Sequence, residues 1–355
     1  MKISVPLLYK EKAMVFEEKN MLITSRASSA IYLVLDSLKD KGNVIVPANL
    51  CYAGIYPILY AGMTPVFCDV EQHSGNTNLG FFKKAVTSET VAAIIPHMYG
   101  NPVKELPEIA EFCKENGILL IEDCASAMGA KADYPLGKVG DYTVYSTGYS
   151  KTLDLGLGGI LFSETHSLDS MREKEKSLPA FLQDDEKNLE LFSKLYRFLR
   201  NNGNKSNIEK EIYKMLPTVC KNAFLHRISD TDANMVKERL SDLPRVIELR
   251  RNCLSRYQSN LKDCGIKYYE YSDGAVPWRF CFFIDPEKRA SFISECLENS
   301  IPISDWYPCV MPLFNQPDGL PEAKKHEMSI LNLPIPLPDQ RIDEICNCIK
   351  KILSV

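Results

Sequence analysis

Several features that mark specialised protein classes are missing from this sequence of 355 residues. It has no basic excess, because 42 Lys and Arg face 46 Asp and Glu for a formal net charge of −4, so its charge does not favour nucleic acid or an anionic membrane surface as a partner. No apolar run approaches the roughly 18–20 residues that span a bilayer. Charged residues at 10–12 follow the N-terminal apolar stretch, so no secretory signal peptide is predicted. These absences favour a cytoplasmic enzyme.

The sequence also lacks the motifs of metal and phosphate sites that depend on close spacing. Its twelve cysteines are scattered, and the one close pair, Cys346 and Cys348, lies in a helical pattern without a second pair or nearby histidines. We therefore expect reduced, buried cysteines and no metal site. Gly137-Lys138 is followed by Val139, which excludes a P-loop, and neither a His-Glu-x-x-His helix nor a Gly-x-Ser-x-Gly elbow is present.

What the chain does have is a regular alternation of short apolar strands and helices. This alternation is typical of a mostly parallel sheet covered by helices on both faces. A charged, amphipathic helical pattern follows, and then a second, smaller set of strands and helices. We predict an α/β fold with a large domain at 1–225, a divergent helical segment within it at about 165–220, and a smaller C-terminal α/β domain at 226–355. Strands are expected at 44–47, 64–67, 91–95, 118–122, 142–145, 160–162 and 278–284.

Three groups follow strands or open a helix at one edge of the predicted sheet, where ligands of open parallel sheets bind. Asp123 ends a strand, and Lys151 lies in a Ser/Gly-rich turn (YSTGYSK, 145–151) before the glycine segment 156–159. Residues 27–29 open a helix whose N-terminus suits a phosphate, and Ser146 offers a second hydroxyl. Taken singly, these are also a capping carboxylate, a solvated lysine and ordinary N-cap serines.

Together the three groups suit pyridoxal phosphate (PLP). A carboxylate can hold the pyridine nitrogen in its protonated form, which makes the ring an electron sink, and a lysine can form a Schiff base with the aldehyde. The hydroxyls and the helix N-terminus would then bind the phosphate. The joint arrangement favours a PLP site over the separate alternatives.

Several sequence blocks resemble the DegT/DnrJ/StrS-type nucleotide-sugar aminotransferases, which are fold-type-I PLP enzymes. The blocks are 60–70 (YAGMTPVFCDV), 94–100 (IIPHMYG), 121–130 (IEDCASAMGA), 137–141 (GKVGD) and the Ser146-to-Lys151 spacing. The resemblance runs over about 20–165 and returns more weakly after 227. It implies a cytoplasmic homodimer with active sites at the interface and no nucleic-acid or membrane partner. It also implies an aminotransferase that moves an amino group from a glutamate-type donor to a nucleotide-linked keto-sugar, for surface polysaccharide or a related glycan.

The resemblance implies roles for individual residues as well. Lys151 would form a covalent aldimine with PLP, with PMP as an intermediate, and would serve as the general base. Asp123 would pair with the pyridine nitrogen. The other cofactor contacts would come from Ala27, Ser28, Cys51, Tyr52, Ala125, Ser126 and Ser146. Substrate contacts would come from His97, Tyr99, Arg227 and Tyr307.

The chain departs from the family pattern near the expected site. The aromatic residue that stacks on the cofactor ring in the family falls at Cys51, with Tyr52 beside it. The chain also departs from the family pattern at Ser126, Gly148, Leu157 and Leu225. Leu225 lies two residues before Arg227. This drift leaves open a non-catalytic or regulatory PLP-binding protein, and a protein without cofactor is a third reading. A PLP/PMP-dependent sugar dehydratase is a fourth, although those relatives carry histidine where this chain keeps Lys151.

Overall fold

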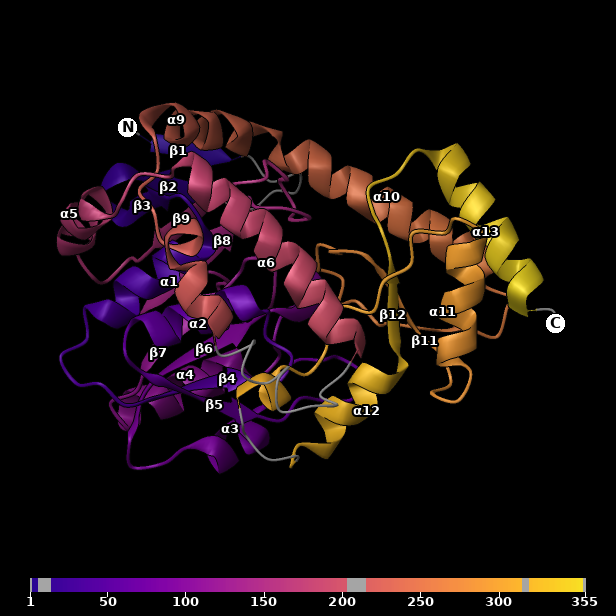
Figure 1. Ribbon diagram of the computed structural model, residues 1–355, viewed down its shortest axis with the longest axis horizontal. Coiled ribbons are helices and arrows are strands. Elements are labelled where there is room, and N and C mark those ends of the chain that lie inside the picture. Colours follow the sequence, from indigo (N-terminus) through magenta and orange to yellow (C-terminus); the bar gives the residue numbers. More distant parts are fainter. Residues whose placement is uncertain (1, 6–13, 203–214, 315–318, 354–355) are drawn as a thin grey trace.

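The computed structural model describes residues 2–5, 14–202, 215–314 and 319–353. Its larger sheet has seven strands, which lie in the left half of Figure 1. The strand order is β3-β9-β8-β7-β6-β4-β5, with β4 to β8 parallel and β9 antiparallel to both β3 and β8. The strands are β3 (Met21–Thr24), β4 (Asn43–Pro47), β5 (Thr64–Cys68), β6 (Thr90–Pro96), β7 (Leu119–Asp123), β8 (Tyr142–Ser146) and β9 (Gly159–Phe162). The predicted mostly parallel sheet is confirmed.

Helices cover both faces of this sheet, which explains why its strands are apolar without alternation. On β4, Val44 and Val46 point into the core under one set of helices, whereas Ile45 belongs to the core on the opposite face. The first face carries α1 (Ala27–Asp36), α2 (Tyr52–Tyr60) and α5 (Asp169–Ser177). The second carries α3 (Leu79–Ala85), α4 (Leu106–Glu115), α9 (Asp230–Arg239) and the start of α10 (Leu243–Leu261).

A three-stranded antiparallel sheet forms the smaller C-terminal α/β unit that the sequence predicts. Its order is β10 (Lys267–Tyr268), β11 (Phe280–Phe283) and β12 (Ile330–Leu333). The end of α10 packs on it with α11 (Arg289–Glu298) and α13 (Asp339–Leu353), and Figure 1 shows α10 running from the large sheet toward this unit. Ile247 of α10 belongs to the core of the large sheet and Tyr257 to that of the small one. The division at residue 225 stays a prediction, and this packing favours a later boundary inside α10.

The predicted helical segment at 165–220 contains α5, α6 (Gln183–Asn202) and the approach to α8 (Lys221–Phe224), while 203–214 lie outside the described residues. An aromatic cluster holds α6 on α2, because Phe192 and Tyr196 lie with ring centroids 4.9 and 4.5 Å from that of Tyr52. None of the described helices is long and apolar enough to cross a membrane.

Among the elements that the sequence did not predict are β3 and α12 (Pro321–Ser329). The four residues of β3 are too few to show a period, and α12 is polar except at a few buried positions. The remaining elements are the β1 (Lys2–Val5) and β2 (Met14–Glu17) hairpin and the 3-10 helices η1 (Glu18–Asn20), η2 (Met98–Gly100), η3 (Leu240–Asp242) and η4 (Met311–Phe314).

Candidate active site

A cavity of about 340 Å³ lies at the carboxyl ends of β7 and β8, bordered by the N-termini of α1 and α2. Its volume is in the range of small-molecule sites. The smaller C-terminal unit closes one side with Trp278, Arg279, Trp306 and Tyr307. The cavity wall contains Ala27, Ser28, Cys51, Tyr52, Asp123, Ala125, Ser146 and Lys151, which the sequence had singled out. The fold thus gathers residues that lie up to 280 positions apart in the chain, from Ala27 to Tyr307.

Asp123 stands at the last position of β7 with its side chain almost fully buried. One carboxylate oxygen accepts a hydrogen bond from the Ala125 N–H at 2.8 Å. Burial raises the pKa of Asp123 above its ordinary value, against the opposing effects of Lys151, this hydrogen bond and His97. The carboxylate is therefore held in one orientation by the backbone and is open to stabilisation by a cation placed in the cavity.

Lys151 enters the same cavity from the loop after β8. Its Nζ donates to Ser126 Oγ at 3.1 Å, so Ser126 takes part in the site although it does not line the cavity. Burial lowers the pKa of Lys151, but the nearby Tyr307, Cys51 and Asp123 raise it by more, so the pKa lies above its ordinary value. In this state the amine is an ammonium that is stabilised by the groups around it.

The smaller unit fixes the loop that carries Lys151. Arg250, buried on α10, donates from Nη2 to the Lys151 carbonyl at 2.6 Å and from Nη1 to the Trp278 carbonyl at 2.9 Å. The indole Nε1 of Trp278 donates at 2.6 Å to the carbonyl of Ser150, whose own φ of 59° is in the left-handed region. These hydrogen bonds connect the backbone at Ser150 and Lys151 to α10 and to Trp278.

Polar groups suited to a phosphate meet at the α1 end of the cavity. Ala27 and Ser28 occupy the first turn of α1, and Ser146 ends β8. Arg26, and not a serine, is the residue before the helix, so the expected serine N-cap is wrong. The hydroxyls of Ser28 and Ser29 instead donate to the Phe224 carbonyl at 3.2 and 2.9 Å.

Cys51 and Tyr52 both line the cavity, but their environments differ. The thiol of Cys51 is close enough to Lys151 and Asp123 to be influenced by both charges, and burial raises the pKa of this thiol above its ordinary value. The ring of Tyr52 is held among Phe192 and Tyr196. Of the two neighbours, Cys51 is therefore the one beside the lysine and the carboxylate.

His97 does not reach the cavity. It is fully buried, its Nδ1 accepts from the Val103 N–H at 3.0 Å, and its Nε2 lies 3.1 Å from Glu122 Oε1. Glu122 also accepts from the Gly137 N–H at 2.6 Å. Among the described residues, His97, Glu122 and Cys124 have donor atoms close enough to hold a metal, but these hydrogen bonds already occupy the histidine and the carboxylate. The structure places His97 in a buried network behind the site.

The other three predicted substrate residues differ in position. Tyr307 lines the cavity, and Tyr99 stands behind it with its hydroxyl accepting from the Tyr307 N–H at 3.1 Å. Arg227 lines a second cavity, of about 540 Å³, and not the first. The two cavities share wall residues at Arg26, Tyr149 and Leu189.

Sequence reasoning missed two arginines of the cavity wall. Arg26 precedes α1, and Arg279 lies with its guanidinium 4.7 Å from the centroid of the Trp278 ring and donates to Ser304 Oγ at 2.9 Å. The feature of the sequence that could have identified Arg26 is its position directly before residues 27–29, which are predicted to open a phosphate-binding helix. No local sequence pattern identifies Arg279, because only the placement of the smaller unit against the large sheet brings this residue to the cavity.

Comparison with known proteins gives consistent matches. The model of a family described as the DegT/DnrJ/EryC1/StrS aminotransferase family matches residues 9–350. The chain is 24% identical over 351 residues to a GDP-perosamine synthase of Vibrio cholerae, covering 95% of this chain and 87% of that protein. It is 26% identical to a dTDP-4-dehydro-2,3,6-trideoxy-D-glucose 4-aminotransferase of Saccharopolyspora spinosa, covering 90% and 80%.

Solved structures show the same fold. The aminotransferase TlmJ from Streptoalloteichus hindustanus superposes with a TM-score of 0.74 at 21% identity, covering 94% of this chain and 86% of that one. The predicted fold class, a parallel-sheet domain with a smaller C-terminal α/β domain, is thereby confirmed.

Proposed function

This chain belongs to the DegT/DnrJ/EryC1/StrS aminotransferase family, and from that premise we propose that it transfers an amino group from a glutamate-type donor to a nucleotide-linked keto-sugar. Aminotransferases of this family depend on PLP. The observation that carries the proposal is the meeting of Lys151, Asp123 and Ser146 in the wall of one cavity at the carboxyl edge of the sheet. Each of the three offers a different part of what the cofactor requires.

The residues present fit PLP. The cavity of about 340 Å³ has a carboxylate, an amine, and a helix N-terminus with hydroxyls in one wall. Bound PLP supplies an electron sink that stabilises a carbanion at the amino-bearing carbon of a substrate. Asp123 would pair with the ring nitrogen, Lys151 would bond to the aldehyde carbon, and Ala27, Ser28 and Ser146 would hold the phosphate. Cys51 and Ala125 would border the ring.

Proton movement falls to Lys151. Its Nζ lies 3.1 Å from Ser126 Oγ, which fixes the amine on one side of the cavity. An amine freed from the cofactor can take a proton from one carbon and return it to another only if it stays beside both. The Arg250 and Ser126 hydrogen bonds hold the lysine backbone and head group in place for this step. Ser126 and Arg250 act as positioning residues and Lys151 as the general base.

The substrate class is supported by the relatives and by the shape of the site. The names of two relatives, GDP-perosamine synthase and the dTDP-sugar 4-aminotransferase, each refer to a nucleotide-linked sugar. The second cavity adjoins the first through Arg26, Tyr149 and Leu189, which gives room for a substrate larger than an amino acid. Lys151 in the cavity favours amino transfer over the sugar dehydratase alternative. The sugar product suits surface polysaccharide or a related glycan.

We also propose a cytoplasmic homodimer whose subunits meet beside the cavities. Two large apolar side chains in the wall of the second cavity are exposed, Tyr149 at 75% and Phe181 at 40%, and Leu182, the next residue along the chain from Phe181, is exposed at 64%. Clustered exposed apolar residues of this kind favour a protein interface. Sedimentation equilibrium should give twice the chain mass of 40.2 kDa, and a stable monomer at micromolar concentration would contradict the dimer.

The activity is tested by incubating the protein with PLP, glutamate and a panel of GDP-, dTDP- and UDP-linked keto-sugars. Mass spectrometry of the sugar should show an amino group in place of the keto oxygen for at least one of them, and the Lys151→Ala protein serves as the matched control. Release of 2-oxoglutarate without any aminated sugar would point to a different acceptor. PLP binding without either product would favour the non-catalytic or regulatory alternative.

A further inference from the structure

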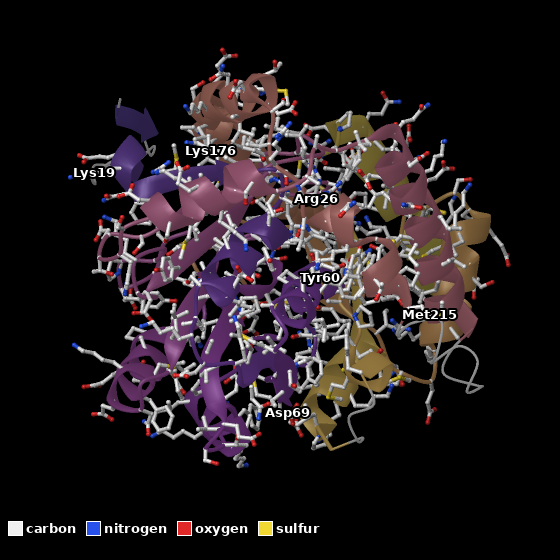
Figure 2. The ribbon with its side chains drawn as sticks, turned by 60° about the vertical axis from the view of Figure 1, so that its left-hand side comes forward. Lys19, Arg26, Tyr60, Asp69, Lys176 and Met215 are labelled. Carbon is white, nitrogen blue, oxygen red and sulfur yellow. The ribbon has the colours of Figure 1, made fainter. Side chains whose placement is uncertain are left out.

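At the α1 end of the cavity lies a cation, Arg26, that forms no ion pair within the part of the chain that the structure describes. Arg26, which is labelled in Figure 2, precedes the first residue of α1. It lines the cavity together with Ala27 and Ser28. Its Nε is buried and has no hydrogen-bond partner, and its guanidinium carbon lies 6.0 Å from the centroid of the Phe224 ring. A guanidinium has five donors, and at least this buried one is unused within the described residues.

The carboxylates in the neighbourhood do not neutralise Arg26. Glu186 and Asp232 line the second cavity together with Arg26. Within the part of the chain that the structure describes, neither carboxylate forms an ion pair with Arg26. Asp232 instead accepts from the Ser229 hydroxyl at 2.7 Å. Burial lowers the pKa of the Arg26 guanidinium, with opposing effects from Tyr52 and Tyr149. A partly desolvated cation that forms no ion pair within the described residues is unfavourable unless an anion joins it.

The groups around Arg26 indicate which kind of anion the site accepts. The N-terminus of α1 favours negative charge, and Ser146 Oγ accepts from the Gly148 N–H at 3.2 Å, so its own proton is available to donate. A guanidinium fork, a helix N-terminus and the hydroxyl of Ser146 match the several oxygens of a phosphate monoester. The amine and carboxylate of Lys151 and Asp123 lie in the same wall, where the rest of PLP would sit.

We propose that Arg26 binds the phosphate of PLP, as the charged contact of a site otherwise made of hydroxyls and backbone. This inference rests on the proposed PLP-dependent function. Two consequences follow from a cation that lacks its anion until the cofactor binds. The protein without PLP is destabilised by Arg26, and the phosphate contributes a large part of the affinity for PLP.

The experiment compares PLP with pyridoxal, which lacks the phosphate, on the cofactor-free full-length protein. Dissociation constants are measured by absorbance and tryptophan fluorescence for the wild type, Arg26→Gln, Arg26→Lys and Arg239→Gln. The last is a matched control, because Arg239 is an exposed surface cation that pairs with Asp242 at 2.8 Å, outside the cavity. Thermal unfolding of each cofactor-free protein is recorded with and without inorganic phosphate.

Arg26→Gln should weaken PLP binding by on the order of ten- to a hundred-fold, the range expected when a hydrogen-bonded charge is lost. Its affinity for pyridoxal should change by less than about twofold. The cofactor-free variant should melt at or above the wild-type temperature, and inorganic phosphate should stabilise it less than it stabilises the wild type. Arg26→Lys, which keeps the charge but not the fork, should fall between the two. Arg239→Gln should match the wild type.

Several results would overturn the assignment. Equal losses of PLP and pyridoxal affinity would mean that Arg26 acts on the packing of the site. Unchanged PLP affinity with a raised KM for glutamate or for the keto-sugar would assign the arginine to a substrate carboxylate or diphosphate. A wild-type protein that binds neither PLP nor pyridoxal would end the proposed function itself, whereas wild-type binding with an unaffected Arg26→Gln would end this inference alone.

Discussion

Two side chains divide the chemistry of the site at the scale of single residues. Lys151 donates to Ser126 Oγ at 3.1 Å, and in the proposed function it would take the covalent and proton-transfer roles. Asp123 accepts from the Ala125 N–H at 2.8 Å and would take an electrostatic role. Removing one should therefore not have the same effect as removing the other. The lysine variant loses a bond to the cofactor, and the aspartate variant loses the charge that keeps the ring protonated.

Replacing Lys151 by alanine should abolish the yellow absorbance band that forms with PLP, because no amine is left to bond with the aldehyde. PLP should still bind, through the phosphate contacts and Asp123, and should be removed by simple dialysis. The measurement is an absorbance spectrum before and after dialysis. A band that persists through dialysis in Lys151→Ala would assign the covalent role to another lysine.

Replacing Asp123 by asparagine should leave PLP binding within about tenfold and lower turnover by at least about 100-fold, because the neutral amide does not hold the ring nitrogen protonated. Steady-state kinetics with glutamate and titration with PLP separate the two quantities. Normal turnover in Asp123→Asn would refute the role of the carboxylate in the electron sink.

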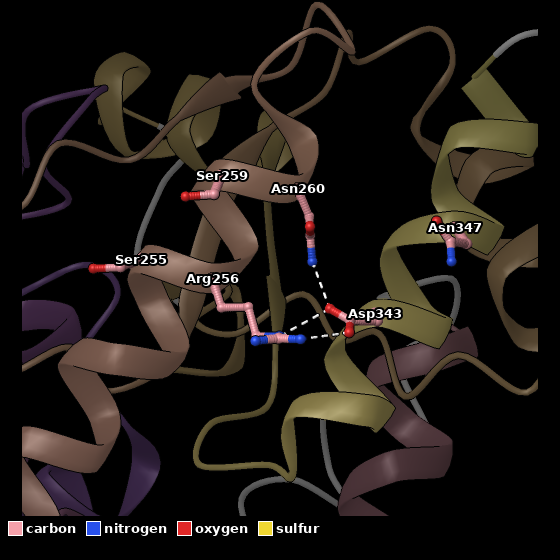
Figure 3. A pocket seen from close by; sticks show the side chains of 6 residues that line it. All are labelled: Ser255, Arg256, Ser259, Asn260, Asp343 and Asn347. Atoms are coloured by element: carbon pink, nitrogen blue, oxygen red, sulfur yellow. Dashed lines mark hydrogen bonds and ion pairs between the residues drawn. The ribbon is translucent and has the colours of Figure 1, made fainter.

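At the scale of elements, α10 connects the two cores and supports the lysine loop. Its buried Arg250 donates to the carbonyls of Lys151, Trp278 and Ile335. Two turns further along the same helix, Arg256 forms an exposed pair with Asp343 of α13, with Asn260 as a second donor to this carboxylate (Figure 3). The same residue type thus has a buried, bridging role at one position of the helix and a surface role at another.

Arg250→Met should lower the free energy of unfolding by about 2–4 kcal/mol, because it leaves buried carbonyl groups without donors. It should also weaken PLP binding, since the Lys151 loop loses its tie to α10. Urea unfolding and PLP titration measure the two effects. Arg256→Met is the matched control and should change both little, because solvent-exposed ion pairs contribute weakly. Equal effects of the two substitutions would show that Arg250 does not support the loop.

The helix α12 is attached by a histidine that must stay neutral. His326 is fully buried, its Nδ1 donates to the Gln72 carbonyl at 2.7 Å, and its Nε2 accepts from the Tyr99 hydroxyl at 2.9 Å. Burial lowers the pKa of His326 to about 4. Between pH 6.5 and about 4 the unfolded chain therefore binds a proton that the folded chain does not, so stability falls as the pH decreases through this window.

For His326 the loss between pH 6.5 and 4 is at most about 3 kcal/mol. Urea unfolding across this range should show a shallower pH dependence for His326→Gln than for the wild type, although the variant is less stable at pH 7 for want of its hydrogen bonds. His226 has a pKa lowered to about 4 by burial as well, so His226→Gln should remove a separate part of the slope. Identical slopes in the wild type and both variants would contradict this account.

At the scale of the whole molecule, the sequence predicted more of the sheet than of the site. Six strands of the large sheet were predicted because buried parallel strands are apolar runs bounded by turns, and β3 was missed because its short run lies at the sheet edge within the mixed N-terminal segment. Asp123, Ser146 and Lys151 were identifiable because strand ends meet at one edge of the sheet. The cavity contacts from Trp278, Arg279 and Trp306 could not be predicted, since they depend on how the smaller unit is placed against the large one.

The same reasoning explains where local similarity was least informative. The motif that contains His97 resembles a family block, but its side chain serves a buried network with Glu122 that no local pattern distinguishes from a substrate contact. The position of Arg26 directly before the small residues 27–29 did not by itself indicate a contact with the cavity. Long-range geometry decides such cases, because burial and hydrogen-bond partners come from distant segments.

The measurement that tests the central claim most directly is an absorbance spectrum of the purified protein with PLP, before and after excess glutamate. We expect a yellow band that forms with PLP, bleaches on addition of glutamate as the cofactor takes up the amino group, and returns when a suitable nucleotide-linked keto-sugar is added. A band that forms but does not respond to any amino-acid donor would contradict the aminotransferase assignment. The absence of any band would show that the cavity does not hold PLP.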